Sequence, residues 1–113
     1  MPSRPNILWI CTDQQRWDTI HALGDFGVAT PRLDQLCEEG AAFTQAYCQN
    51  PICTPSRASF LTGLYPSANH VNQNGNAAFP ARMSEHLVTR RLAEEAGYRG
   101  GLIGKLHIAS AFA

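Results

Sequence analysis

Residues 53–63 read CTPSRASFLTG, and this stretch predicts a short helix. Pro55 suits the first turn, where its missing N–H removes no helical hydrogen bond, and Gly63 suits the end of the helix. Cys53 therefore falls at or just before a helix N-terminus, where backbone N–H groups favour an anion, including the thiolate of a cysteine. Arg57 lies one helical turn further on and can place its guanidinium beside Cys53. The stretch predicts a site for an anion at a helix start, with the Cys53 thiol beside it.

Apolar runs on both sides of this stretch predict two strands. Residues 7–11, ILWIC, have polar neighbours before and after, as in a strand buried on both faces of a parallel sheet. A second strand is predicted over 99–104. Further helices are predicted to begin at Thr30-Pro31 and to end at Gly40, and to run from a Ser84 cap to about Ala96 and stop at Gly97.

Alternating strands and helices predict an α/β fold with a mostly parallel sheet flanked by helices. Between the predicted helices, residues 65–80 are rich in Pro, Ser, Asn and Gly, and they are predicted to form a long surface loop. A substrate pocket and solvation in such a loop explain the polar side chains of His70, Asn72 and Asn74 equally well, so they are assigned no role.

Three polar clusters would meet at one edge of such a sheet, because ligands bind beyond the carboxyl ends of its strands. Two of the clusters each follow a predicted strand, and the third opens the helix at Cys53. Arg57 and Lys105 are two cations suited to a small tetrahedral oxyanion ester, such as a sulfate or a phosphate. Asp13 and Gln14 carry oxygen donors of the kind that Ca²⁺ and Mg²⁺ prefer. The clusters are Asp13-Gln14, Cys53 to Arg57, and Lys105 with His107.

The three clusters resemble the motifs of the type I, formylglycine-dependent sulfatases, which belong to the alkaline-phosphatase-like superfamily. Residues 53–63 match the C-x-P-S-R motif of these enzymes and its continuation. Residues 5–8 followed by 13–16 resemble their opening strand and first metal-binding loop, and 104–107, GKLH, resemble their G-K-x-H element. The resemblance implies an alkaline-phosphatase-like fold, of which residues 1–113 would be an incomplete N-terminal portion of the catalytic domain.

The resemblance also implies a sulfuric ester hydrolase in which Cys53 is oxidised to formylglycine by a formylglycine-generating enzyme. One hydroxyl of the hydrated aldehyde would attack the sulfur of a small-molecule sulfate ester, and the other would expel sulfate by re-forming the aldehyde. Arg57 would hold the diol, and His107 would hydrogen-bond to it. Lys105 would contact both the diol and the sulfate.

A divalent cation is implied as well: usually Ca²⁺ in this family, with Mg²⁺ and Mn²⁺ as alternatives. It would polarise the sulfate oxygens. Asp13, Gln14 and the modified Cys53 would be its ligands, and further ligands, with a further His and a further Lys of the site, are expected beyond residue 113. Many sulfatases carry two adjacent aspartates where this chain has Asp13-Gln14. Glutamine is a neutral oxygen donor, so the difference reduces the negative charge without removing a ligand.

Two alternative functions stay open. Phosphonate monoester hydrolases and related phosphodiesterases use the same motif and the same nucleophile, and a catalytically inactive fragment could serve as a binding module with Cys53 unmodified. A phosphate-binding Walker loop is excluded, because Arg99 and Leu106 stand where it needs Gly and Ser or Thr. The spacing of Cys48 and Cys53 fits neither a redox pair nor a zinc site.

Composition is that of a small globular domain. The chain has 113 residues, of which 44% are hydrophobic, and nine basic residues balance nine acidic ones. This balance gives no reason to expect nucleic acid or an anionic membrane as a partner. Residues 7–11 are too few for a signal-peptide core or a membrane span, so we expect a cytoplasmic protein. We also expect the chain alone to be catalytically incomplete and to expose apolar sheet surface.

Overall fold

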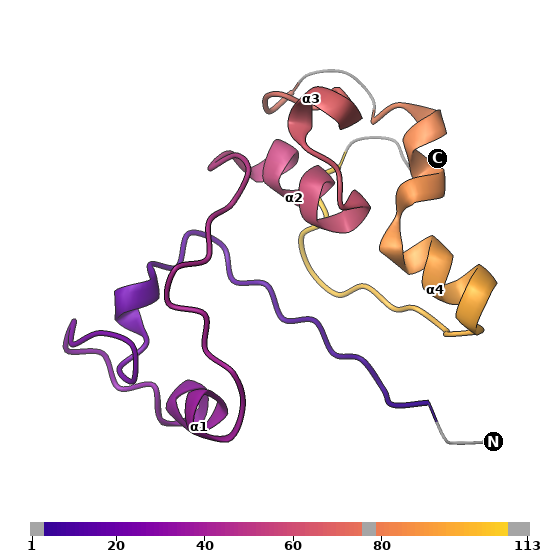
Figure 1. Ribbon diagram of the computed structural model, residues 1–113. Helices are drawn as coiled ribbons and strands as arrows, with labels where there is room; N and C mark the ends of the chain where they lie inside the picture. Colours follow the sequence, from indigo (N-terminus) through magenta and orange to yellow (C-terminus); the bar gives the residue numbers. More distant parts are fainter. Residues whose placement is uncertain (1–3, 76–78, 109–113) are drawn as a thin grey trace. The chain divides into compact units, whose positions relative to one another are not determined.

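The computed structural model describes residues 4–75 and 79–108 and divides the chain into two compact units, Met1–Ala46 and Tyr47–Ala113 (Figure 1). None of the helices within these described ranges is long and apolar enough to cross a membrane. The first unit contains the 3-10 helix η1, Trp17–Thr19, and the helix α1, Pro31–Glu39. The second contains α2, Cys53–Thr62, α3, Pro66–Asn69, the 3-10 helix η2, Ala81–His86, and α4, Val88–Ala96.

Helix α1 begins and ends as predicted, with Pro31 at its first position and Gly40 just beyond its end. Thr30 is not the cap that the sequence predicts, because its side chain makes no capping hydrogen bond to the helix backbone. Its hydroxyl instead donates to Asp34 Oδ1 at 2.9 Å and accepts the N–H of His21 at 2.8 Å. Thr30 therefore ties the first turn of α1 to the preceding loop.

The two predicted strands are not confirmed, since no strand occurs among the residues that the structure describes. Residues 7–11 and 99–104 carry no regular secondary structure. Their apolar side chains are exposed: Leu8 is 83% and Ile103 is 102% accessible. A strand forms only when a neighbouring strand completes its hydrogen bonds, and a strand buried on both faces also needs covering layers. The sequence carries the apolar pattern, but the pairing that would use it is not formed within the described residues.

Helix α2 is the centre of the second unit, and its prediction is confirmed at both ends. It begins at Cys53 and ends before Gly63, which takes the left-handed conformation at φ 71°. Ala58, in the middle of the helix, is fully buried in the apolar core. The chain after α4 runs back to α2, and Ile108 joins this core (Figure 1). The core consists of Ala58, Val71, Phe79, Met83, Leu87 and Ile108, with Leu61, Leu64 and Leu106 packed against it.

The prediction of a surface loop over residues 65–80 is wrong in part. Helix α3 forms one turn there and contacts α2. Asn69 is 0% exposed because its side chain satisfies two backbone groups: it donates to the Leu64 carbonyl at 3.2 Å and accepts the Val71 N–H at 2.9 Å. A composition typical of loops thus contains a buried anchor, since a polar side chain can be buried when it is hydrogen-bonded.

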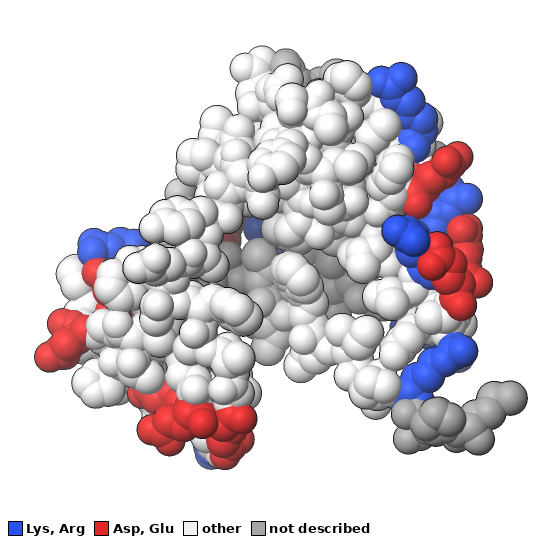
Figure 2. All heavy atoms as spheres, viewed as in Figure 1, with Lys and Arg blue, Asp and Glu red and all other residues white. Residues whose placement is uncertain are grey.

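The helix predicted from a Ser84 cap to Ala96 is divided in two. Residues Ala81–His86 form η2, and α4 begins only at Val88. Leu87 between them is extended and buried in the core, so Ser84 lies inside η2 and does not cap α4. Helix α4 carries the exposed ion pairs Arg90–Glu94 and Arg91–Glu95. Figure 2 shows basic and acidic side chains interspersed on the side of the molecule where α4 lies. The face of α4 that carries these pairs is therefore a solvated one. The end of α4 at Gly97, with φ 66°, is as predicted.

Replacing Gly63 by alanine should lower the free energy of unfolding by about 1 kcal/mol, because a Cβ disfavours the left-handed conformation. No atom lies within 4 Å of that Cβ position, so a clash does not contribute. Urea or thermal unfolding measures the change. The matched control is Gly100→Ala, which also meets open space but has no left-handed φ. Equal free energies of unfolding for Gly63→Ala and Gly100→Ala would contradict the left-handed conformation assigned to Gly63.

Candidate active site

Cys53, the predicted nucleophile, is the first residue of α2, as the sequence predicts. It is partly exposed and its thiol is free. The residue before it, Ile52, occupies the cap position, but its apolar side chain cannot accept a hydrogen bond from the helix. The start of this helix therefore depends on acceptors from elsewhere in the chain.

Two asparagines supply these acceptors, and sequence reasoning assigned neither of them a role. Asn50 Oδ1 accepts the N–H of Ile52 at 2.8 Å, and Asn74 Oδ1 accepts the N–H of Thr54 at 2.9 Å. Pro55 has no N–H to offer. The expectation of open backbone amides that attract an anion is therefore only partly met. Asn50 has a local signal, an Asx-type turn before the helix, but Asn74 acts from 20 residues away and has none.

Arg57 connects two of the three predicted clusters. Its side chain is 8% exposed, and Nη1 donates to the backbone carbonyl of Lys105 at 2.6 Å. A hydrogen bond from a charged donor in a shielded position is among the stronger ones in proteins. The structure thus brings the C-x-P-S-R helix and the G-K-x-H segment together, as the sequence predicts. It adds a role for Arg57 that the sequence did not indicate, namely holding the backbone of Lys105 in place.

Lys105 and His107 lie on an irregular segment that alternates between exposed and inward-packed residues. Both are exposed, whereas Leu106 packs against the core and Ile108 is buried in it. His107 takes a left-handed conformation at φ 54°, which is uncommon for a residue other than glycine. Such strained positions occur often at functional sites. The two apolar residues anchor the segment, and the two candidate catalytic residues remain accessible to a ligand.

The predicted metal ligands, Asp13 and Gln14, lie in the first unit. Both are exposed in a bend, and Gln14 has a left-handed φ of 58°. Carboxylate and amide oxygens fit a hard cation, but Ca²⁺ takes roughly six to eight oxygen ligands, so these two residues supply only part of a site. Across the described ranges there is no group of three or more His, Cys, Asp or Glu that could hold a metal ion. The convergence of Asp13 and Gln14 with Cys53 stays a prediction.

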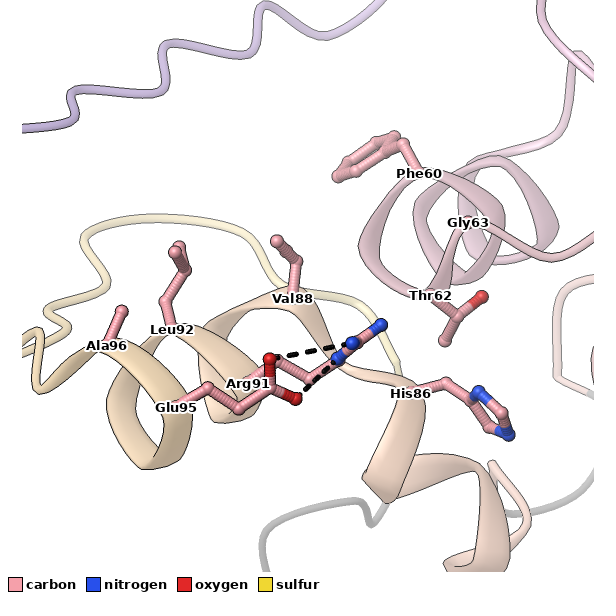
Figure 3. Close-up of a pocket in the computed structure, with 9 residues that line it drawn as sticks. All are labelled: Phe60, Thr62, Gly63, His86, Val88, Arg91, Leu92, Glu95 and Ala96. Carbon is pink, nitrogen blue, oxygen red and sulfur yellow. Dashed lines mark hydrogen bonds and ion pairs between the residues drawn. The ribbon is translucent and has the colours of Figure 1, made fainter.

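A hollow of about 370 Å³ lies between the C-terminal end of α2 and α4 (Figure 3). The apolar face of α4 looks toward Phe60 of α2, and the Arg91–Glu95 ion pair lies at its side. None of the predicted site residues lines it, so this hollow is separate from the candidate active site. Its lining consists of Phe60, Thr62, Gly63, His86, Val88, Arg91, Leu92, Glu95 and Ala96.

The structure places a cysteine at a helix start and a buried arginine that holds a Gly-Lys-x-His segment, and these are the motifs on which the family comparison bears. The family model described as Sulfatase matches residues 5–110, and the chain belongs to the sulfatase family. Membership of this family implies an alkaline-phosphatase-like fold. The comparison with solved structures finds no significant match.

Three similar proteins are named as sulfatases. The chain is 40% identical over 107 residues to the ulvan-active sulfatase of Formosa agariphila, covering 95% of this chain and 20% of that protein. It is 35% identical over 117 residues to N-acetylgalactosamine-6-sulfatase of Rattus norvegicus, covering 95% of this chain and 22% of that protein. It is 36% identical over 117 residues to arylsulfatase H of Homo sapiens, covering 94% of this chain and 20% of that protein. The chain therefore spans about a fifth of the length of these relatives.

Arg57→Met should loosen the segment that carries Lys105, because methionine keeps the packing of the side-chain stem but has no donor. We expect faster hydrogen exchange of the Leu106 and Ile108 amides and a loss of about 1.5–3 kcal/mol in the free energy of unfolding. Arg82→Met, at an exposed arginine of η2, is the matched control. Unchanged exchange at both amides in Arg57→Met would show that the bond does not hold the segment.

Proposed function

We propose that this protein hydrolyses a sulfate ester through a formylglycine formed from Cys53. The observation that carries the proposal is the hydrogen bond from Arg57 to the Lys105 carbonyl, which joins two motifs that are far apart in the sequence. Membership of the sulfatase family and the names of its relatives support the same reaction. The substrate class is a small-molecule sulfate ester, and a formylglycine-generating enzyme is the partner that the modification requires.

The proposed roles follow from charge and exposure. The hydrated aldehyde at position 53 supplies the hydroxyl that attacks sulfur. Lys105, an exposed cation, binds the sulfate and opposes the charge that develops on its oxygens. Arg57 fixes the Lys105 backbone through one of its N–H groups, and its charge lies one helical turn after the diol at position 53. His107 is accessible and can exchange a proton with the diol hydroxyl or with the leaving alcohol.

We further propose that Asp13 and Gln14 contribute to a divalent cation site, with Ca²⁺ as the first candidate, in a larger catalytic domain of which residues 1–113 form a portion. The cation supplies Lewis-acid polarisation of the sulfate oxygens. Residues 7–11 and 99–104 are proposed as strands of its sheet. The support is their apolar sequence, their exposed side chains and the chain's coverage of about a fifth of its relatives. Strand pairing would place Asp13 and Lys105 at one sheet edge.

Co-expression with a formylglycine-generating enzyme should convert Cys53 and should lower the mass of its peptide by about 18 Da, the difference between CH₂SH and CHO. Peptide mass spectrometry measures this change. Fragment ions assign the loss to one cysteine, and Cys11, Cys37 and Cys48 serve as internal controls that should keep their thiols, because they lie outside the motif. An unmodified Cys53 under these conditions would favour the inactive binding module.

Lys105→Ala should lower kcat/KM for an aryl sulfate about 100-fold or more in the full-length, formylglycine-containing enzyme, because a fixed cation at the reacting oxygens is lost. Arg90→Ala, on the exposed face of α4, is the control and should leave kcat/KM unchanged. The same assay with an aryl phosphonate monoester separates the rival chemistry. If kcat/KM is higher for the phosphonate than for the aryl sulfate, the proposed function changes from sulfatase to phosphonate monoester hydrolase.

A further inference from the structure

The start of α2 has no cap from its own sequence. Ile52 stands at the cap position, and no side-chain cap hydrogen bond is formed there. Uncapped amides in the first turn lower the stability of a helix and let its end fray. Fraying at this end would displace Cys53 directly, because Cys53 is the first residue of the helix. Whatever holds the first turn therefore also sets the position of the nucleophile.

Asn74 holds the first turn from another part of the unit. Its Oδ1 accepts the N–H of Thr54 at 2.9 Å, and Thr54 is the residue next to Cys53. Pro55 offers no N–H, and the Ser56 N–H is already bonded to the Ile52 carbonyl at 3.0 Å. The bond to Asn74 is therefore the side-chain cap of this turn, supplied from 20 residues further along the chain.

The loop that carries Asn74 is itself anchored. Val71, three residues earlier, is buried in the core, and the fully buried Asn69 binds the Val71 N–H through its side chain. Gly75, directly after Asn74, takes a left-handed conformation at φ 71°, which turns the chain at this point. The amide of Asn74 is thus presented to α2 by a fixed stretch of chain, although the side chain itself is exposed.

We propose that Asn74 is a positioning residue for the nucleophile: by accepting the Thr54 amide hydrogen it fixes the first turn of α2 and thereby the reactive group at position 53. This inference rests on the proposed function of Cys53. It does not make Asn74 a catalytic residue, because its contact is with the backbone of Thr54. Small displacements of a reacting group lower the rate of the chemical step. We therefore expect loss of the Asn74 contact to lower kcat more than it changes KM.

The test compares Asn74→Ala with Asn74→Asp in the full-length enzyme, with kcat divided by the measured formylglycine content. Alanine removes the acceptor and should lower kcat for an aryl sulfate roughly tenfold to 100-fold. Aspartate keeps an acceptor oxygen and suits a helix N-terminus, so kcat should return to within about threefold of the wild type. Because the negative charge of aspartate repels an anionic substrate, KM should be higher in Asn74→Asp than in the wild type. Asn72→Ala, in the same loop, is the matched control.

Hydrogen exchange of the Thr54 amide provides a readout that does not depend on activity. It should be faster in Asn74→Ala than in the wild type and in Asn74→Asp. An unchanged kcat in Asn74→Ala would overturn the proposal, and so would a low kcat in both variants, because aspartate preserves the acceptor. If the wild type carries formylglycine but does not hydrolyse sulfate esters, the proposed function fails. The exchange of the Thr54 amide still decides whether Asn74 is the cap.

Discussion

The hydrogen bond from the Arg57 guanidinium to the Lys105 carbonyl is the constraint on which the candidate site depends. It joins the first half of α2 to a segment 48 residues further along the chain, and Arg57 is almost completely shielded from water. Burying a guanidinium is costly unless it is hydrogen-bonded, so the bond and the burial require each other. Ala58, next to Arg57, and Ile108, three residues after Lys105, pack in the same core. The apolar core and the charged bond thus fix Lys105 and His107 relative to the motif helix.

The beginning of α2 shows how an apolar residue at a cap position is tolerated. Asparagine side chains from outside the helix bind the N–H groups of Ile52 and Thr54, and Pro55 has none. Backbone amides that are already bonded attract a substrate anion less strongly than open ones. In the proposed reaction the attraction for a sulfate would therefore fall mainly to the cationic side chains of Arg57 and Lys105. This division suits a site in which the side chains hold the ligand and the backbone fixes the geometry.

Local signals were sufficient where the structure is decided locally. Pro31 and Gly40 predicted the two ends of α1, and Pro55 and Gly63 predicted those of α2, because proline and glycine act through their own backbone geometry. Local sequence signals failed where the structure depends on residues that are far apart in the chain. Ser84 was predicted as a cap, but burial of Leu87 in the core separates η2 from α4. Residues 7–11 and 99–104 have strand composition without strand pairing, since a strand is completed only by its neighbour.

The sequence by itself determined the family and the place of Cys53, the proposed nucleophile, at a helix start. Each of these depends on residue type and on short spacing along the chain. Only the tertiary structure decided that Arg57 binds the Lys105 backbone and that Asn69 is a buried anchor. It also decided that Asn74 caps the motif helix. These contacts join residues that no local pattern relates, because a hydrogen bond between distant segments forms only after packing has brought them within about 3 Å of each other.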